Sequence, residues 1–502
     1  MNIPRIAAAI VAAVLTAPHP ALAGDFMDTR ITWVFGDDDF LAGAGEKIPD
    51  SPLPSISDRE GYELFFDNLD SRYSGRENQT HLVMYKMMPG FIANLTTEAA
   101  VVLQFDIFEG GSDFGDDGTY LKLHYHTGSM DSDDGVSVVF FPFDTERLRL
   151  GYLWDISWGG GAIFTNKRRC WSPGAKVAFQ HGIFDAFVGF KTAKISMVQE
   201  ETSGGQPLNV QDTAYGFLGG AGVDLANAFR IDLGAGYFQQ GTFEFNGLVG
   251  RPVYTAGFSL RLAYHLGREV SMPADYALYR NEPDAQDQLV PAPVLEGGEE
   301  TEKTKEFSLQ ISAEGTVLIQ HLADPDSFGS TVVQPAYTAA LQFLMAYGGL
   351  SAHVTGFYRS TTYILHTVPG FSPFWGLPNA VDTKDELFAA LGVSYHFDRS
   401  HLTPSLILGI QAPATYSAGS TTVVIRDVNS RDILPTGEAR EPIFSTRASL
   451  KWDLSEMMSI MLFLQYSRDY NRTRLVRDPD GTFRTFLSPD ELGGALVAQA
   501  RF

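Results

Sequence analysis

The sequence predicts an all-β fold, a transmembrane antiparallel β-barrel of about 18 strands, with about 16 as the alternative count. Three observations lead to this prediction. Apolar residues recur with a period of two in many short runs, which is typical of β-strands. The connections between these runs alternate between short and long. The chain is rich in aromatic residues, with 36 Phe and 20 Tyr, yet its mean hydropathy is only −0.06. A barrel that is apolar outside and polar inside explains all three observations.

The amino-terminus predicts export. Arg5 precedes the uninterrupted apolar run 6–15, and Ala21-Leu22-Ala23 precedes Gly24. This order of a charged region, a short apolar region and a small-residue cleavage site is typical of a secretory signal peptide over residues 1–23. The apolar run is too short to span a bilayer core of about 30 Å. With one cysteine, the exported chain has no internal disulfide.

Residues 24–80 do not show the regular strand pattern. The stretch 31–35 could form a short strand, but three consecutive aspartates at 37–39 and the Pro/Ser-rich stretch 49–57 interrupt the pattern. We therefore expect residues 24–80 to form an acidic amino-terminal extension or a small insert in the lumen, and residues 81–502 to form the barrel.

Eighteen runs have the length that a membrane-spanning strand needs. They are 81–86, 99–108, 120–126, 136–143, 147–158, 176–181, 184–194, 215–225, 229–239, 254–265, 307–314, 337–347, 350–358, 387–397, 406–411, 444–453, 460–466 and 492–502. The most regular is 147–158, in which Leu148, Leu150, Tyr152, Trp154, Ile156 and Trp158 share one face.

The connections predict which way the barrel is oriented. Short links at 144–145, 182–183, 226–227, 348–349, 399–400 and 454–455 alternate with longer ones, and counting back from Phe502 places every short link on one side. Bacterial barrels have short periplasmic turns and long outer loops, so the short links are expected in the periplasm. The Pro/Glu-rich insert 268–305 breaks this pattern on the periplasmic side. Three interpretations are open. The segment is a periplasmic insert, or one strand has been missed and the segment lies on the outer side of the membrane, or it separates two domains.

The last strand carries a resemblance. Leu492, Gly494, Leu496, Ala498, Ala500 and Phe502 share one face of the run 492–502. This run resembles the closing strand of Gram-negative outer-membrane β-barrel proteins of the porin type, whose terminal Phe is the recognition signal for barrel assembly. The resemblance implies an outer-membrane location, contact with outer-membrane lipid, and recognition of the carboxy-terminal strand by the barrel-assembly machinery.

The register also predicts which side chains face the lumen, because a charge on the lipid face costs about 2–4 kcal/mol near the bilayer midplane. The lumen-lining candidates are Lys122, Arg147, Arg149, Lys176, Lys191, Arg230, Arg261, Arg447, Lys451, Asp155, Asp185 and Asp232. In one interpretation these charges pair across the lumen and fill it. In the other, rings of Arg and Lys give the channel a preference for anions.

Aromatic residues are expected at both membrane interfaces. Trp154 and Trp158 fall at the outer end of their predicted strand. The candidates for the periplasmic interface are Tyr264, Phe397, Trp452 and Phe502.

No cofactor is expected, and the candidate metal-binding patterns are weak. The acidic links Asp113-x-x-Asp116-Asp117 and Asp131-x-Asp133-Asp134 could hold Ca²⁺, but neither has the spacing of an EF-hand, and solvated acidic turns are more common. His124 and His126 share one strand face without a third ligand nearby in sequence, so we interpret them as lumen side chains.

Composition and motifs exclude other classes of protein. A net charge of −23 without a basic stripe argues against nucleic-acid binding. The nucleophile-elbow, zinc-protease, P-loop and dinucleotide patterns do not occur in a fitting context, so we do not expect an enzyme. The predicted function is a porin-like channel for passive or selective passage of small solutes. The alternatives are a structural or partner-docking barrel and, third, an outer-membrane hydrolase.

Overall fold

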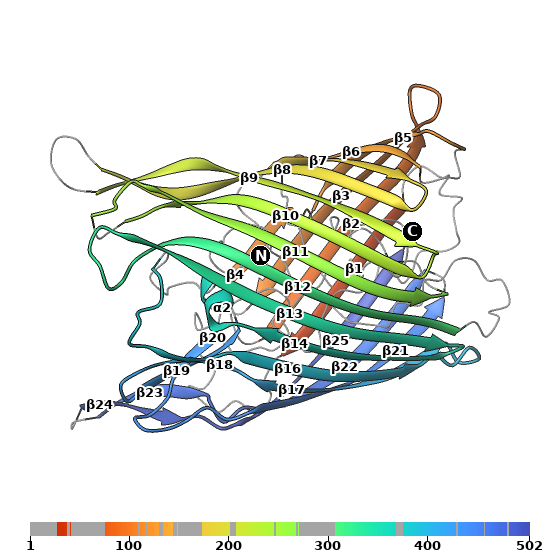
Figure 1. Cartoon of the computed structure of the whole chain (residues 1–502). Coiled ribbons are helices and arrows are strands. Elements are labelled where there is room, and N and C mark those ends of the chain that lie inside the picture. The colour runs from red at the N-terminus through yellow and green to blue at the C-terminus, as the bar shows by residue number, and fades with distance from the viewer. Residues whose placement is uncertain are drawn as a thin grey trace.

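Figure 1 shows an antiparallel β-barrel, and this computed structural model confirms the predicted all-β fold class. The structure describes residues 28–37, 41, 76–108, 111–116, 118–129, 134–143, 148, 173–200, 207–244, 247–267, 270, 307–367, 375–427, 430–455, 457–478 and 481–501. No helix in this part of the chain is long and apolar enough to cross a membrane.

The barrel wall is one sheet in which each strand pairs with its neighbours in an antiparallel register. Its strands are β1 (Asp28–Asp37), β2 (Arg76–Pro89), β3 (Leu95–Phe108), β4 (Gly111–Asp116), β5 (Tyr120–His126), β6 (Gly135–Phe141), β7 (Gly174–His181), β8 (Phe184–Glu200), β9 (Pro207–Leu225), β10 (Phe229–Thr242), β11 (Pro252–Leu266), β12 (Phe307–Ala323), β13 (Thr331–Tyr347), β14 (Leu350–Arg359), β16 (Glu386–Tyr395), β17 (Leu402–Ala412), β21 (Ile443–Ser455), β22 (Met458–Arg468) and β25 (Asp490–Arg501).

Two of these 19 strands share one place in the wall, so the barrel has 18 wall positions. β4 pairs with the second half of β3 and β5 pairs with the first half. The break between them is held by Asp116, whose Oδ2 accepts hydrogen bonds from the backbone N–H groups of Gly118 (3.1 Å) and Thr119 (3.2 Å). Thr119 Oγ1 then accepts a hydrogen bond from Val102 N–H at 3.0 Å, which replaces the missing ladder contact.

The barrel closes between its first and last strands. β1 pairs with β2 on one side and with β25 on the other, for example Trp33 with Ala498. The side chains also meet at this seam, where Gln499 Nε2 donates to Thr32 Oγ1 at 3.1 Å. Closure leaves no free edge in the sheet.

The two ends of the barrel differ, and we call them the short-turn end and the long-loop end. At the short-turn end, on the right in Figure 1, the wall strands are joined by residues 90–94, 127–134, 182–183, 226–228, 348–349, 396–401 and 456–457. At the long-loop end the connections include 38–75, 142–173, 360–385, 413–442 and 469–489. β11 pairs directly with β12, so the acidic connection 267–306 begins and ends at the short-turn end and no wall strand was missed there.

The structure corrects the expectation for two segments. Residues 28–37 and 76–80 were expected outside the wall, but β1 and the start of β2 are wall strands. The predicted strand 147–158 lies outside the described residues except for Leu148. β6 pairs with β7 along its whole length, so no wall strand lies between them and 142–173 is one connection. The two differences cancel, which is why the predicted count of about 18 is confirmed.

The same correction reverses the predicted direction of the strands that precede residue 144. β2, β3, β5 and β6 each run opposite to the direction expected from the pattern. The link 144–145, expected at the short-turn end, belongs to the connection at the long-loop end. The signal-peptide prediction for residues 1–23 and the aromatic residues Trp154, Trp158 and Phe502 lie outside the described residues.

Smaller elements lie at the long-loop end. A four-stranded sheet contains β15 (Asp382–Lys384), β18 (Ala414–Ala418), β19 (Thr421–Asp427) and β20 (Ser430–Ile433). The strands β23 (Thr473–Asp478) and β24 (Gly481–Phe486) form a hairpin that extends beyond the wall in Figure 1. The helix α2 (Thr361–Thr367) follows β14 directly, and Ser360 caps its amino-terminus by accepting a hydrogen bond from Tyr363 N–H at 3.2 Å.

Candidate functional site: the barrel interior

The wall separates an apolar outer face from a polar inner face. Along β11, Phe258, Leu260 and Leu262 point outward and are 37–50% exposed, whereas Ser259 and Arg261, which alternate with them, are at most 5% exposed. A soluble protein would bury the apolar set and expose the polar one. The reversed pattern is the one that a lipid-facing barrel with a polar interior requires.

The inner face carries the predicted charged residues that the structure describes. Lys176, Lys191, Arg230, Arg261, Arg447, Asp185 and Asp232 are at most 7% exposed, and Lys122 and Lys451 are partly buried on the same face. Arg147, Arg149 and Asp155 lie outside the described residues. Of the predicted interface aromatics, Phe397 and Trp452 are about half exposed and Tyr264 is half-buried, all three at the short-turn end.

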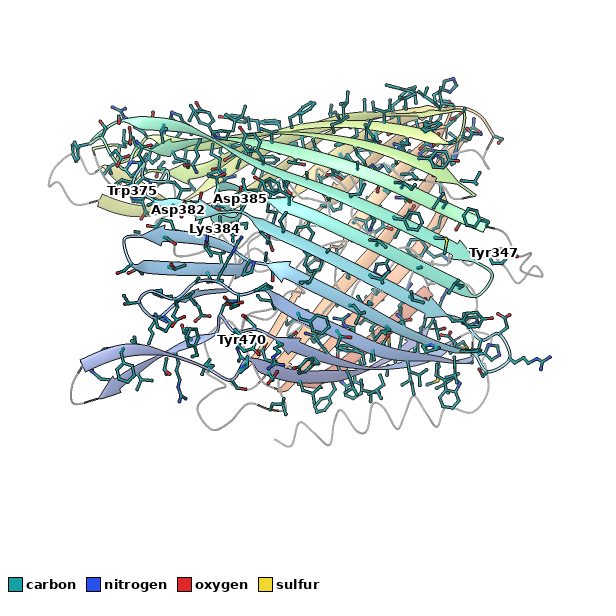
Figure 2. All side chains as sticks on the ribbon, turned by 60° about the horizontal axis from the view of Figure 1, so that its bottom comes forward. Tyr347, Trp375, Asp382, Lys384, Asp385 and Tyr470 are labelled. Atoms are coloured by element: carbon teal, nitrogen blue, oxygen red, sulfur yellow. The ribbon has the colours of Figure 1, made fainter. Side chains whose placement is uncertain are left out.

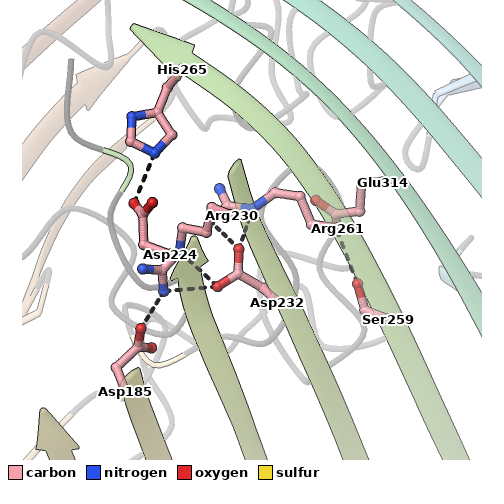
Figure 3. Close-up of polar contacts among 8 residues, drawn as sticks. All are labelled: Asp185, Asp224, Arg230, Asp232, Ser259, Arg261, His265 and Glu314. Carbon is pink, nitrogen blue, oxygen red and sulfur yellow. Dashed lines mark hydrogen bonds and ion pairs between the residues drawn. The ribbon is translucent and has the colours of Figure 1, made fainter. Parts of the chain in front are cut away.

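One group of these charges forms a compact cluster on β8, β10 and β11, near the short-turn end. Figure 3 shows its contacts. Arg230 donates to Asp185 Oδ2 through Nη2 at 2.6 Å and to Asp232 Oδ1 through Nε at 2.8 Å. Arg261 donates to the other oxygen of Asp232 through Nε and Nη2, at 2.8 and 2.6 Å. Two arginines and two aspartates thus balance each other, and we call these four residues the charge cluster.

A glycine makes room for the charge cluster. Gly222 on β9 lies between Asp185 and Asp232 in the register. A Cβ atom at this position would lie 2.5 Å from both Arg230 Nη2 and Asp232 Oδ1, and 2.9 Å from Asp185 Oδ2. Any side chain there would displace the ion pairs, so the glycine is part of the cluster's geometry.

Further polar contacts extend the charge cluster on both sides (Figure 3). Toward the short-turn end, His265 Nε2 lies 2.8 Å from Asp224 Oδ2. On the other side, Ser259 of β11 donates to Glu314 Oε1 of β12 at 3.2 Å. The inner wall from β8 to β12 is therefore lined by carboxylates and their partners.

A second buried ion pair lies near the long-loop end, and the sequence interpretation missed it. Arg359 at the end of β14 donates from Nε to Glu386 Oε2 at 2.5 Å, and Gln411 on β17 donates to the other oxygen of Glu386. Arg359 and Glu386 are 4% and 0% exposed. Each stands one residue outside a predicted alternating run, so extending those runs by one position would have found the pair.

Residues of two connections pack against the inner side of the wall. Tyr363 of α2 is 3% exposed and belongs to an apolar cluster with the inward side chains Phe238 and Leu318. Leu148, from the connection 142–173, belongs to the same cluster and is fully buried. Its carbonyl oxygen accepts a hydrogen bond from Lys191 Nζ at 2.8 Å. The interior is thus narrowed from the long-loop end by residues of both connections.

Asp116 of the first acidic link, Asp134 of the second and the paired histidines have structural partners, whereas Asp117, Asp131 and Asp133 lie outside the described residues. Asp116 closes the break between β4 and β5, as described above. His126 Nε2 lies 2.8 Å from Thr96 Oγ1, and its ring meets that of His124 edge-on at 4.3 Å between centroids. Among the residues that the structure describes, no group of three or more His, Cys, Asp or Glu is placed to hold a metal ion. Cys170 lies outside those residues.

Comparisons with known proteins give only distant similarities. No protein-family model matches the chain, and no curated protein sequence matches it. Similar solved structures include the outer-membrane protein OpdK of Pseudomonas aeruginosa, with 10% identity over 95% of this chain and 98% of that one, at a TM-score of 0.45. OccK11 (OpdR) of the same organism has 8% identity over 95% of each chain, at a TM-score of 0.44. OccAB4 of Acinetobacter baumannii has 10% identity over 95% and 97%, also at 0.44. Similarity this distant assigns neither a solute nor a role to any residue.

Proposed function

We propose that the chain is a Gram-negative outer-membrane channel that lets small solutes pass through its lumen. The observation that carries the proposal is the closed wall of 18 positions with an apolar outer face and a polar, charged inner face. In lipid every backbone polar group needs a partner, and a closed barrel supplies one to each strand. A barrel of this size encloses a water-filled path unless loops fill it, and here two connections narrow the path.

In the outer membrane the barrel would contact two kinds of partner, lipid and the barrel-assembly machinery. The outward leucine, phenylalanine and tyrosine side chains would contact lipid, and β25, which closes the barrel against β1, would present the carboxy-terminal strand to the barrel-assembly machinery. Heat-modifiable migration in gels tests the membrane barrel. A protein that is extracted without detergent would contradict it.

Conductance in planar lipid bilayers tests the channel itself. Stepwise openings of the purified protein are expected, because the inner face carries the charge cluster and further buried polar side chains. A sealed barrel without conductance would instead support a structural or partner-docking role, for which the long acidic connection 267–306 at the short-turn end is the candidate segment.

We further propose a preference for anions. The charge cluster and the Arg359–Glu386 pair are balanced, so they contribute no net charge to the lumen. Lys176, Lys191 and Arg447 add further basic side chains to the inner face, each at most 3% exposed. Rings of basic side chains favour anions in channels. The reversal potential in a salt gradient tests this, and a preference for cations would contradict it.

A further inference from the structure

The β23–β24 hairpin exposes large apolar side chains on both of its faces. Leu475 and Phe486 are 61% and 43% exposed on one face, and Phe483 is 49% exposed on the other. A two-stranded hairpin that stands alone is marginally stable in water. An amphiphilic surrounding that covers these side chains would stabilise it.

The same hairpin carries exposed cations. Arg474 and Arg477 are exposed, and Arg484, half-buried, donates to Thr473 Oγ1 at 3.3 Å. Residues 473–486 contain these three arginines and two aspartates, Asp478 and Asp480. The sides of the hairpin therefore combine apolar surface with positive charge, which is the composition of surfaces that bind anionic lipid.

The base of the hairpin is fixed to the barrel and continues its lipid-facing surface. Arg472, 4% exposed, pairs with Glu491 of β25 at 3.1 Å, and Thr473 Oγ1 donates to Asp432 Oδ1 at 2.9 Å. Tyr470, 46% exposed, lies at this base in Figure 2, and the guanidinium carbon of Arg468 is 5.1 Å from its ring centroid. Below them on β22, Leu462 and Leu464 belong to the exposed apolar face.

From this placement we propose that the β23–β24 hairpin binds the phosphate-bearing headgroups of lipid in the outer leaflet. The planar guanidinium group of arginine donates two parallel hydrogen bonds to a phosphate. When no phosphate is bound, the same N–H groups of an exposed arginine donate to water. Leu475, Phe483 and Phe486 would lie among the sugars and acyl chains next to the phosphates. The proposal rests on the outer-membrane placement given above, since only then does the long-loop end face that leaflet.

The test measures binding of bisphosphorylated lipid A to the full-length protein in detergent, with dephosphorylated lipid A as the second ligand. The triple variant R474Q/R477Q/R484Q is expected to bind the phosphorylated lipid about 100-fold more weakly, or about fivefold per arginine. Dephosphorylated lipid is expected to bind native protein and variant equally. Arg251→Gln, which removes an exposed arginine from another connection at the long-loop end, is the control and is expected to bind like the native protein.

Equal binding of phosphorylated lipid by native protein and triple variant would overturn the proposal, and so would an equal loss in the Arg251 control. Millimolar inorganic phosphate is expected not to compete, and full competition would identify a free-phosphate site instead. Leu475→Asn with Phe486→Asn is expected to weaken binding of both lipids, since it removes apolar contact and leaves the arginines. Heat-modifiable migration and conductance of each variant report on the barrel and not on lipid binding. A failure of the channel proposal is therefore distinguishable from a failure of the lipid-binding proposal.

Discussion

Arg261 and Asp232 face each other directly in the register of β10 and β11, and two nitrogens of Arg261 donate to the same oxygen, Oδ2, of Asp232. The side chains are 1% and 3% exposed, and the second oxygen of the carboxylate accepts from Arg230. Both arginines of the charge cluster therefore depend on one carboxylate.

Removing the charge of the Asp232 carboxylate is expected to lower the free energy of unfolding. Asp232→Asn leaves Arg230 and Arg261 buried with half of their counter-charge, and breaking a buried pair in this way costs about 3 kcal/mol or more. The measurement is the free energy of unfolding in urea with lipid vesicles. Asp398→Asn, whose side chain is 86% exposed, is the control and is expected to change it by less than about 0.5 kcal/mol. Equal stability of the two variants would show that the cluster is solvated.

The space at Gly222 gives a second prediction. Gly222→Ala places a methyl group 2.5 Å from Arg230 Nη2 and Asp232 Oδ1, so the ion pairs must separate, at an expected cost of about 2 kcal/mol. Gly315→Ala on β12 meets no atom within 4 Å and is the matched control. Unfolding in urea measures both variants. A Gly222 variant as stable as the control would mean that the cluster rearranges freely.

The Arg359–Glu386 pair is suited to a double-mutant cycle. Single replacements by methionine each leave a buried charge without its partner, whereas the double replacement removes both charges together. A coupling energy of about 2 kcal/mol is expected from the unfolding free energies. Gln411, which also donates to Glu386, stays unchanged in all four proteins. Additive effects of the two replacements would contradict a direct interaction.

The contact between Lys191 and the Leu148 carbonyl predicts an effect on conductance. Lys191→Met removes the hydrogen bond that fixes Leu148 against β8, so single-channel conductance is expected to rise and anion preference to fall. Because a hydrogen bond from a charged donor contributes about 1.5–3 kcal/mol, the effect on the position of Leu148 should be large. Lys384→Met at an exposed position is the control. Unchanged conductance in the Lys191 variant would show that Leu148 does not narrow the path.

The wall could be predicted from sequence because each strand carries its own evidence. In β11 and β16 every outward residue is more exposed than its inward neighbours, so a period of two identifies both strands without knowledge of their partners. The alternation of short and long connections is equally local, and it holds from β7 to β25 except for the connection 267–306.

The first part of the wall could not be predicted in the same way. Residues 147–158 have the most regular alternation in the chain, yet a period of two does not distinguish a wall strand from a segment that lies elsewhere. β1 has a weaker pattern and obtains its partner from β25, more than 450 residues away. Such a pairing leaves no trace within a local window.

The charge cluster was predicted only as a set of residue types. The register gave inward positions to Asp185, Arg230, Asp232 and Arg261, but their pairing depends on the stagger between strands. The role of Gly222 depends on that stagger as well, and a glycine in a strand otherwise indicates only a weak point.

The seam between β1 and β25 has a consequence for how the barrel folds. Thr32 and Gln499 meet across it, so the cylinder acquires its last row of hydrogen bonds only when opposite extremes of the polypeptide are both in place. Until then the N–H and C=O groups along both open edges of the sheet have no partner, and they can pair with a strand of a neighbouring chain. Loss of either strand would therefore leave open sheet edges that favour aggregation, so the chain needs protection until both strands have paired.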